Sequence, residues 1–301
     1  MYYDFIIIGG GPAGLTAAVY GLRAGRTVLI LEEQMTGGQL TLTPEVENYP
    51  SWQKISGWEL AGKIADQAST AGAEIRTEPV LALETADGRH TVVTESGRYE
   101  AGVVIVANGA KRRKLGCPGE QELTGRGVSY CAVCDGAFFR NRTVCVVGGG
   151  NTALEDALYL AKVCEKVYLI HRRDSFRGEK KLQDAVLHSE KIEILWNTAV
   201  EAVEGENRVE RVKLSGDHAG ELAVDGVFVA IGLAPDNERF APVLDLDEGG
   251  YIRAGEDCRT NVPGIYAAGD TRTKEVRQIL TAAADGAVAA TLASAWLNEQ
   301  G

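Results

Sequence analysis

The sequence lacks an excess of basic residues: its 301 residues include 31 Lys and Arg against 42 Asp and Glu, a net charge of −11. An acidic chain is repelled by phosphate backbones, so nucleic acid is not an expected partner. The chain also lacks a basic leader. The uncharged stretch at residues 5–22 follows Asp4 and contains five glycines and Pro12. That composition predicts a strand, a glycine turn and a helix, so we expect a cytoplasmic protein without a membrane segment.

Cysteine is scarce, with six residues, and a chain of this length can bury a core without a disulfide scaffold. In a reducing compartment all six are expected to be thiols unless one pair is catalytic. Cys145 and Cys164 stand in an apolar run and a helical stretch, which predicts buried thiols. Cys117 and Cys258 stand in loop-like sequence and are assigned no role.

Glycine, by contrast, is abundant, with 36 residues, and no collagen period or Gly/Ser linker accounts for it. An internal repeat is the most informative feature of the chain. Residues 5–33 and 144–172 align without a gap at a shift of 139. Each segment has an apolar run, a triple glycine, an Ala/Leu-rich helical stretch and a second apolar run, which predicts a βαβ unit. Two such units predict an α/β fold with two dinucleotide-binding domains.

Three further apolar runs predict buried strands, at residues 102–107, 226–230 and 264–268. The last run leads into a predicted helix, rich in small residues, over 281–296. This strand and helix would have no sheet to join unless the second βαβ unit were inserted into the first.

We therefore expect the chain to cross between domains near residues 111–114 and 235–239. The basic run at 111–114 is then a solvated crossing, although such a run can also be a docking signal. The expected domains are residues 1–112 together with 240–301, and residues 113–239.

The first glycine loop is a G-x-G-x-x-G motif between a predicted strand and helix, formed by Gly9, Gly11 and Gly14. Its glycines allow a tight turn, close approach of a pyrophosphate, and close packing of the helix on the strand. Glu32 or Glu33 ends the second strand, where a carboxylate can accept ribose hydroxyls. The motif therefore predicts a dinucleotide held at the helix N-terminus, with a ribose that lacks a 2′-phosphate.

The second glycine loop, residues 148–153, has a different charge at the same strand end. Under the 139-residue shift the two glutamates become His171 and Arg172, followed by Arg173 and Arg177. Arginines attract a ribose 2′-phosphate and can pair with it bidentately. We therefore predict an NADPH site in the second unit, with a solvated basic patch as the alternative.

A Cys-x-x-Cys motif precedes the second βαβ unit, with Cys131 and Cys134 followed by Asp135. This spacing in a helical turn brings the two sulfurs together and suits reversible disulfide exchange. A zinc site would need two more ligands at short spacing, and the sequence has no second such motif or nearby His pair, so no metal is expected. Two buried structural thiols remain an alternative. Asp135 is either a proton donor to a leaving thiolate or the start of an Asp-Gly turn.

Taken together, the motifs resemble those of the low-molecular-weight thioredoxin reductases over the whole chain. They are GGGPAG (9–14), GGQL (37–40), EVENYP (45–50), CAVCDG (131–136), GGGNTA (148–153), HRRDSFR (171–177), IYAAGD (265–270) and RQ (277–278). The resemblance implies two three-layer, Rossmann-like domains, with an NADPH domain (113–239) inserted into an FAD domain (1–112 and 240–301). One departure is Asn108, where the family usually has Thr; it is expected to have little consequence.

The resemblance also implies the roles of individual residues. The FAD pyrophosphate and adenosine ribose would be held by Gly9, Gly11, Pro12, Ala13, Gly14 and Glu32 or Glu33. The flavin would lie along Gly38, Gln39, Leu40 and Asn48, with Gly269 and Asp270 at the ribityl and pyrophosphate region and Arg277, Gln278 and Ile279 near the ring. NADPH would be bound by Gly150, Asn151, Thr152, His171, Arg172, Arg173 and Arg177. Cys134 would be the flavin-proximal thiol, Cys131 the thiol that attacks the partner disulfide, and Asp135 the acid.

The implied reaction carries electrons from NADPH through FAD to the Cys131–Cys134 disulfide and then to a thioredoxin-like partner. The inserted domain would rotate between two orientations, since nicotinamide and dithiol would otherwise compete for one flavin face, and the protein would be a homodimer. Three alternatives remain open: a flavin dithiol oxidase, a ferredoxin-linked reductase on the same scaffold, and a catalytically silent redox sensor. The arginines disfavour the oxidase, and the cysteine pair disfavours a simple ferredoxin–NADP reductase.

Overall fold

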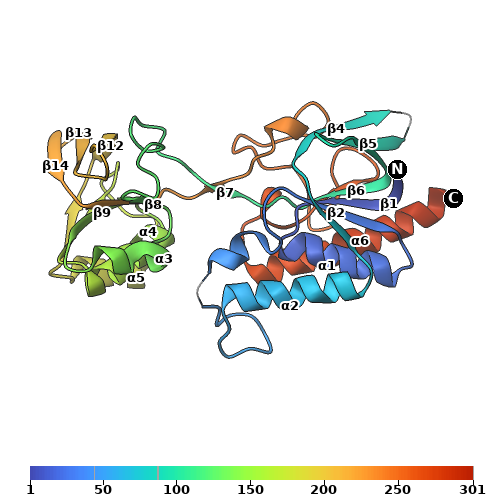
Figure 1. Cartoon of the computed structure of the whole chain (residues 1–301), viewed down its shortest axis with the longest axis horizontal. Coiled ribbons are helices and arrows are strands. Elements are labelled where there is room, and N and C mark those ends of the chain that lie inside the picture. Colours follow the sequence, from blue (N-terminus) through green and yellow to red (C-terminus); the bar gives the residue numbers. More distant parts are fainter. Residues whose placement is uncertain (44, 87, 301) are drawn as a thin grey trace. The chain divides into compact units, whose positions relative to one another are not determined.

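The computed structural model describes residues 1–43, 45–86 and 88–300 (Figure 1). Its internal contacts divide the chain into two compact units, one made of residues 1–111 and those from 234 on, the other of residues 112–233. The first unit is discontinuous and the second is inserted into it. The short strands β7 (Lys111–Arg112) and β16 (Leu233–Ala234) pair with each other where the chain leaves and re-enters the first unit.

The first unit is built on one sheet in the order β3-β2-β1-β6-β5-β4, with β17 also paired to β6. Strands β1, β2, β3, β6 and β17 run parallel, so their carboxyl ends meet at one edge, while β4 and β5 form an antiparallel hairpin beside β6. The strands are β1 (Tyr2–Ile8), β2 (Val28–Glu32), β3 (Glu74–Thr77), β4 (Val80–Ala86), β5 (Arg89–Thr94), β6 (Arg98–Val106) and β17 (Ile265–Ala267).

Helices α1 (Pro12–Arg23), α2 (Gly57–Thr70) and α6 (Ile279–Gln300) lie on one face of this sheet (Figure 1). The 3₁₀ turns of this unit are η1 (Gly38–Leu42), η3 (Glu238–Phe240) and η4 (Gly269–Thr271). Apolar side chains fill both faces of the sheet, with α1 and α6 packed over Phe5, Ile7 and Ile105. A Cβ at Gly286 of α6 would lie 2.1 Å from the carbonyl oxygen of Ala13, so α6 and α1 meet at backbone contact distance.

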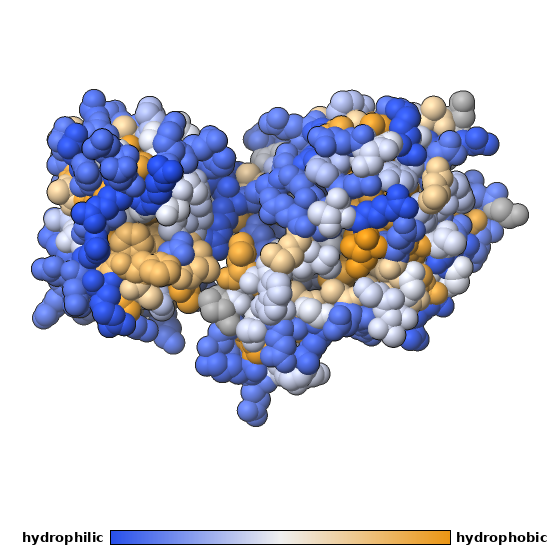
Figure 2. Space-filling view, in the orientation of Figure 1, coloured by the Kyte–Doolittle hydropathy of each residue, from blue (hydrophilic) through white to orange (hydrophobic). Residues whose placement is uncertain are grey.

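Helix α6 is long and apolar enough to cross a membrane by length and composition alone. Its Ala282, Ala289, Ala290 and Ala293 are buried in the core of the unit with side chains of α1 and the sheet. Small residues at this spacing let two helices approach closely, so this face of α6 packs as part of the core. Figure 2 shows apolar surface over the helical layer of this unit.

The inserted unit has a five-stranded parallel sheet in the order β11-β10-β9-β15-β8. Its strands are β8 (Val128–Ser129), β9 (Thr143–Gly148), β10 (Lys166–Ile170), β11 (Ile192–Leu195) and β15 (Gly226–Ala230). One layer against this sheet is helical and consists of α3 (Ala132–Asp135), η2 (Gly136–Phe139), α4 (Asn151–Val163) and α5 (Lys180–Leu187). The other layer is an antiparallel sheet of β12 (Thr198–Glu204), β13 (Arg211–Gly216) and β14 (Gly220–Ala223).

The repeat predicted from the sequence is confirmed as two units of the same topology, β1-α1-β2 and β9-α4-β10. The β-branched runs form the buried strands, and the triple glycines form the turns into the helices. The first unit has a mostly parallel sheet covered by helices, and the second has a parallel sheet between two layers, so the predicted Rossmann-like α/β architecture is also confirmed.

Candidate cofactor and redox sites

The first glycine loop leaves β1 and enters α1 with backbone that only glycine accepts. Gly9 has φ +107°, and a Cβ at Gly14 would lie 1.9 Å from the oxygen of Gly9. A Cβ at Gly11 would meet nothing within 4 Å, so this side of the loop is open. Helix α1 begins at Pro12 without a side-chain cap. Its first N–H groups and its dipole therefore face open space, which suits an anionic group.

The structure separates the roles of the two glutamates after β2. Glu32 is buried, and its Oε2 accepts the N–H of Gly10 at 2.6 Å while Oε1 accepts that of Gln34 at 3.0 Å. Glu33 instead pairs with Lys111 at 3.0 Å, in a cluster with Asp236 and Arg239. Glu32 is thus the carboxylate at the glycine loop. Glu33 belongs to an ion cluster beside the two segments through which the chain leaves and re-enters the first unit.

Three segments distant in sequence close around the start of α1. The Gly37 N–H donates to Gly10 O at 2.7 Å, and a Cβ at Gly38 would lie 3.4 Å from the Gly11 Cα. From the other end of the chain, a Cβ at Gly269 would lie 2.9 Å from the Ala13 Cβ. The predicted residues of 9–14, 37–40 and 269–270 therefore lie together around the open side of the loop.

The remaining predicted flavin residues extend this group. The Gln39 side chain donates to the oxygen of Ala110, and Leu40 is buried. The Asn48 Nδ2 donates to the Gln278 Oε1 at 3.1 Å, which ties residue 48 to the segment before Ile279, the first residue of α6. The Arg277 guanidinium lies 4.1 Å from the centre of the Tyr251 ring, and its buried Nε has no partner among the described residues.

An orphaned acceptor shows that this region fits a hydroxylated cofactor such as FAD. Asp270 Oδ1 is buried and has no hydrogen-bond partner within the described part of the chain. Burial raises the pKa of Asp270, against the opposing effect of Lys274 and Arg277. A buried acceptor is costly unless a donor meets it, and a ribityl hydroxyl is a donor of the required kind.

The second glycine loop repeats the geometry of the first with different side chains. Gly148 has φ +155°, and α4 begins at Asn151 without a side-chain cap. The Asn151 Oδ1 accepts the Glu179 N–H at 2.7 Å, which fastens the loop after β10 to the start of α4. A Cβ at Gly150 would meet nothing within 4 Å, and Thr152 is exposed. This loop is therefore also open for an anion at a helix N-terminus.

His171 directly follows β10 and packs against this loop. It is buried, its Nε2 lies 3.0 Å from Ser175 O, and a Cβ at Gly149 would lie 2.2 Å from its ring. Burial lowers the pKa of His171, and the positive charges of Arg177, Arg173 and Arg172 lower it further. The neutral ring is thus the favoured form at neutral pH.

The three arginines are exposed around His171, and none forms an ion pair within the parts of the chain that the structure describes. The Arg177 N–H donates to Gly149 O at 2.8 Å, so its backbone is fixed against the glycine loop. In a chain of net charge −11, three unpaired guanidinium groups beside an open helix N-terminus form a site for a phosphate-rich ligand.

The two cysteines of the motif form a disulfide with a Cα–Cα distance of 5.3 Å. Cys131 stands at the N-cap of the single-turn helix α3, and its Sγ lies 3.2 Å from the Cys134 N–H. An N–H directed at the sulfur stabilises a thiolate there once the bond is reduced. Cys131 is half-buried and Cys134 exposed, so the bond is accessible for exchange.

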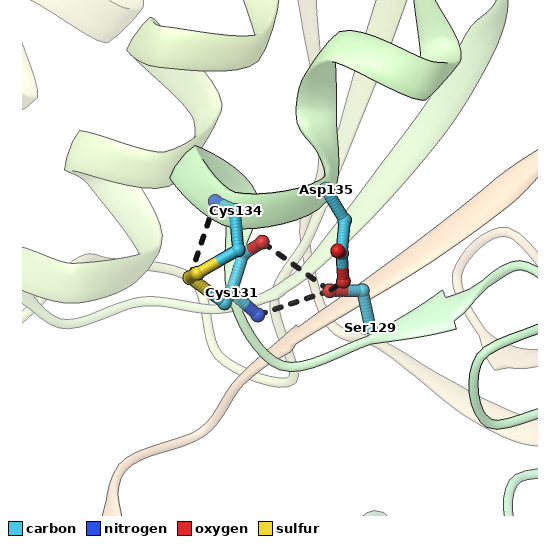
Figure 3. The surroundings of a disulfide bond; sticks show 4 residues. All are labelled: Ser129, Cys131, Cys134 and Asp135. Carbon is cyan, nitrogen blue, oxygen red and sulfur yellow. Dashed lines mark hydrogen bonds between the residues drawn. A yellow bond between two sulfur atoms is a disulfide. The ribbon is translucent and has the colours of Figure 1, made fainter. Parts of the chain in front are cut away.

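Ser129 links the disulfide to Asp135 (Figure 3), and the sequence motifs gave no signal for it. Its hydroxyl accepts the Cys131 N–H at 3.0 Å and donates to the Asp135 Oδ2 at 2.6 Å. The serine is 5% exposed. The carboxyl group of Asp135 is therefore held on the same turn as Cys131 by a short hydrogen bond.

The other four cysteines are free thiols. Cys145 and Cys164 are buried, as predicted, and burial raises the pKa of both, to about 11 for Cys164. Burial also raises the pKa of Cys258, to about 12, and that of half-buried Cys117. Thiols with raised pKa values are poor nucleophiles, so the exchange chemistry belongs to the disulfide pair.

Two dinucleotide-type loops in one chain, one beside a carboxylate and one beside arginines, together with an accessible disulfide, define a two-domain disulfide oxidoreductase. The sequence pattern of the pyridine nucleotide-disulphide oxidoreductase family matches residues 3–286. The chain belongs to that family.

Individual relatives agree with this membership. A thioredoxin reductase of Listeria innocua is 46% identical over 303 residues, covering 99% of this chain and 94% of the relative. The crystal structure of Lactococcus lactis thioredoxin reductase superposes with a TM-score of 0.90 at 41% identity, covering 99% of both chains. A ferredoxin–flavin thioredoxin reductase of Clostridium acetobutylicum matches with a TM-score of 0.56 at 32% identity, covering 99% of both chains.

Proposed function

We propose that the chain is an NADPH-dependent thioredoxin-disulfide reductase. The observation that carries this proposal is the Cys131–Cys134 disulfide, which lies in the same inserted unit as the unpaired arginines around His171. The relatives named thioredoxin reductase support it over nearly their full length. We assign FAD to the discontinuous domain, expected at 1–112 and 240–301, and NADPH to the domain expected at 113–239, close to the division at 111/112 and 233/234.

In this proposal Gly9, Gly11, Gly14 and Glu32 hold the FAD pyrophosphate and ribose, and Asp270 accepts a ribityl hydroxyl. Bound FAD supplies two-electron transfer between the nicotinamide and the disulfide. On the inserted unit, the N–H groups at the start of α4 hold the NADPH pyrophosphate, and Arg172, Arg173 and Arg177 pair with its 2′-phosphate.

The exchange step is then carried by the chain's own dithiol. The Cys131 thiolate attacks the partner's disulfide, forms a mixed disulfide and expels one partner thiolate, which takes up a proton. Asp135, held by Ser129 on the same turn, is the proposed proton donor in its protonated form, and the Ser129 hydroxyl stabilises the carboxylate that forms as the proton leaves. The Cys134 thiol next loses its proton and attacks the Cys131 sulfur, and the second partner thiolate is expelled and takes up that proton. The partner leaves as a dithiol and the Cys131–Cys134 disulfide is restored.

The test is an anaerobic titration with NADPH, followed at the visible flavin band, and then turnover with an oxidised thioredoxin. We expect NADPH to reduce the flavin and one disulfide per chain, and the enzyme then to turn over with oxidised thioredoxin. A flavin that stays oxidised with NADPH would contradict the nucleotide site. Stoichiometric reduction without turnover would identify a redox sensor instead.

A ferredoxin-linked reductase is the second candidate, because one structural relative carries that name. The unpaired Arg172, Arg173 and Arg177 favour NADPH, since a one-electron protein donor has no use for a 2′-phosphate site. Reduction of the flavin by reduced ferredoxin but not by NADPH would reverse this preference.

We also infer a cytoplasmic homodimer in which the inserted domain rotates about the paired strands β7 and β16. A shallow apolar groove of about 300 Å³ between α1 and α6, lined by Tyr20, Ala287, Val288, Thr291 and Leu292, supports a second copy as a partner. Sedimentation velocity of the wild type and of Val288→Asp tests this: a dimer that the substitution dissociates is expected, and a wild-type monomer would contradict it.

A further inference from the structure

A buried carboxylate on α6 reaches the turn that carries Asp270. Asp285 is 6% exposed, and its Oδ2 accepts the Gly269 N–H at 2.9 Å. Gly269 has φ +80° and is pressed against Ala13, so the turn has little freedom to move by itself. Asp285 thus ties the turn η4 to α6 directly beside the first glycine loop.

Two cations complete this contact. Arg272, only 1% exposed, donates through Nε to Asp285 Oδ2 at 2.8 Å and through Nη2 to Oδ1 at 2.9 Å. Lys274 adds a third contact, from Nζ to Oδ2 at 2.8 Å. Burial opposes the ionisation of Asp285, but these hydrogen bonds outweigh it and lower the pKa of the carboxyl group. The group is therefore ionised, paired and fully hydrogen-bonded.

The same arrangement leaves Asp270 available. Lys274 and Arg277 lie close enough to influence Asp270, yet its Oδ1 is buried without a partner among the described residues. Lys274 instead contacts Asp285, and Arg272 contacts both Asp285 and Glu256. If Asp285 lost its charge, Lys274 would be free to turn to the neighbouring carboxylate of Asp270.

We propose that the Asp285–Arg272 pair is a positioning pair for FAD, which fixes the Gly269–Asp270 turn and keeps Asp270 Oδ1 free to accept a cofactor hydroxyl. The inference rests on the proposed function, because it assumes that this site holds FAD. It assigns a function to two residues that belong to neither the glycine loop motif nor the Cys-x-x-Cys motif. A pair that served only the fold would stabilise the protein without affecting FAD affinity.

Four variants test the inference. Asp285→Asn removes the charge but keeps an acceptor for the Gly269 N–H. The double variant Asp285→Leu with Arg272→Met replaces the pair by apolar groups and leaves the buried Lys274 without its carboxylate, so its FAD affinity is compared only if it folds. Arg272→Lys keeps the charge and loses the bidentate contact. Arg26→Met is the matched control, because Arg26 contacts Ser294 O and Asn298 at the far end of the same helix.

The measurement is FAD binding to flavin-stripped protein, followed by the quenching of flavin fluorescence, with circular dichroism and thermal unfolding of the stripped protein alongside. Asp285→Asn and the double variant are expected to raise the Kd for FAD about tenfold or more, the equivalent of one charge-assisted hydrogen bond. Arg272→Lys is expected to raise it by a smaller factor and Arg26→Met to leave it unchanged.

The outcomes separate this inference from the proposed function. If the wild type does not bind FAD, the proposed function itself fails. If the wild type binds FAD and every folded variant binds it within twofold of the wild type, the positioning role is wrong and the pair is structural. Should Asp285→Asn not fold, Arg272→Lys decides by the same criterion.

Discussion

Replacing Ser129 by alanine tests the proposed exchange chemistry at a residue that no sequence motif pointed to. The substitution removes the donor to Asp135 Oδ2 at 2.6 Å and the acceptor of the Cys131 N–H at 3.0 Å. A hydrogen bond to a charged group contributes about 1.5–3 kcal/mol, and about 1.4 kcal/mol corresponds to a factor of ten in rate. Full loss would slow exchange about 10- to 100-fold. Only the part needed in the transition state counts, so we expect kcat to fall about tenfold.

The assay is oxidation of NADPH at saturating oxidised thioredoxin, with anaerobic reduction of the flavin by NADPH measured separately. The nucleotide site is untouched by the substitution, so the KM for NADPH and the rate of flavin reduction are expected to remain those of the wild type. Ser129→Thr, which keeps the hydroxyl, is expected to restore part of kcat. Ser294→Ala is the matched control, because this serine is also buried but donates to the helix carbonyl of Ala290 at 2.8 Å. A Ser129→Ala enzyme that folds and keeps kcat within twofold would refute the assigned role.

Three further perturbations follow from the same geometry. Arg172→Gln and Arg173→Gln should each raise the KM for NADPH by about tenfold or more while leaving that for NADH unchanged, since each removes a charge-assisted contact to the 2′-phosphate; equal effects on both nucleotides would argue for a general electrostatic patch. Burial lowers the pKa of His90 below its ordinary value of 6.5, so its contribution to stability is present above that pH and is lost as the pH falls through it. The acid-induced loss of stability, measured by urea unfolding at pH 7.5 and pH 5.5, should therefore be smaller in His90→Leu, and an unchanged pH dependence would exclude this histidine as a cause. Gly14→Ala places a Cβ 1.9 Å from Gly9 O and should abolish FAD retention. In the control Gly62→Ala on α2, the Cβ meets nothing within 4 Å, so this variant should retain FAD and its free energy of unfolding should rise by about 0.5–1 kcal/mol. The ratio of flavin to protein absorbance of the purified variants measures FAD retention.

The sequence predicted most reliably what depends on local pattern. The strand, glycine turn and helix of each βαβ unit were predictable because apolar periodicity and left-handed glycines act over a few residues. The choice between Glu32 and Glu33 was not, because both are acidic and adjacent. Successive side chains of a strand point to opposite faces, and only the position of β2 beside Gly10 shows which one faces the loop.

Contacts between distant segments were beyond the reach of sequence pattern. Asn108, expected to replace Thr with little consequence, donates to Asp236 O at 3.1 Å and Asn237 Oδ1 at 3.0 Å and accepts from Thr271 at 2.7 Å. A threonine hydroxyl has a single proton and could not make both donations. The amide thus joins the segment just before β7, where the chain leaves the first unit, to the segment just after β16, where it returns. Ser129 and Asp285 were missed for the same reason, since their partners are set by tertiary turns.

The repeat explains how one backbone design serves two different nucleotides. In the first unit a Cβ at Gly10 would lie 3.2 Å from the carboxylate of Glu32, and in the second a Cβ at Gly149 would lie 2.2 Å from the ring of His171. These are equivalent positions under the 139-residue shift. In both units the residue at or just after the end of the second strand packs on the second glycine of the loop, so a Cβ at that glycine would press on this side chain. Changing that side chain from a carboxylate to a neutral ring flanked by arginines reverses the local charge without altering the turn. Under the proposed function, the same loop geometry would hold a pyrophosphate in both units while the preferred ribose differs.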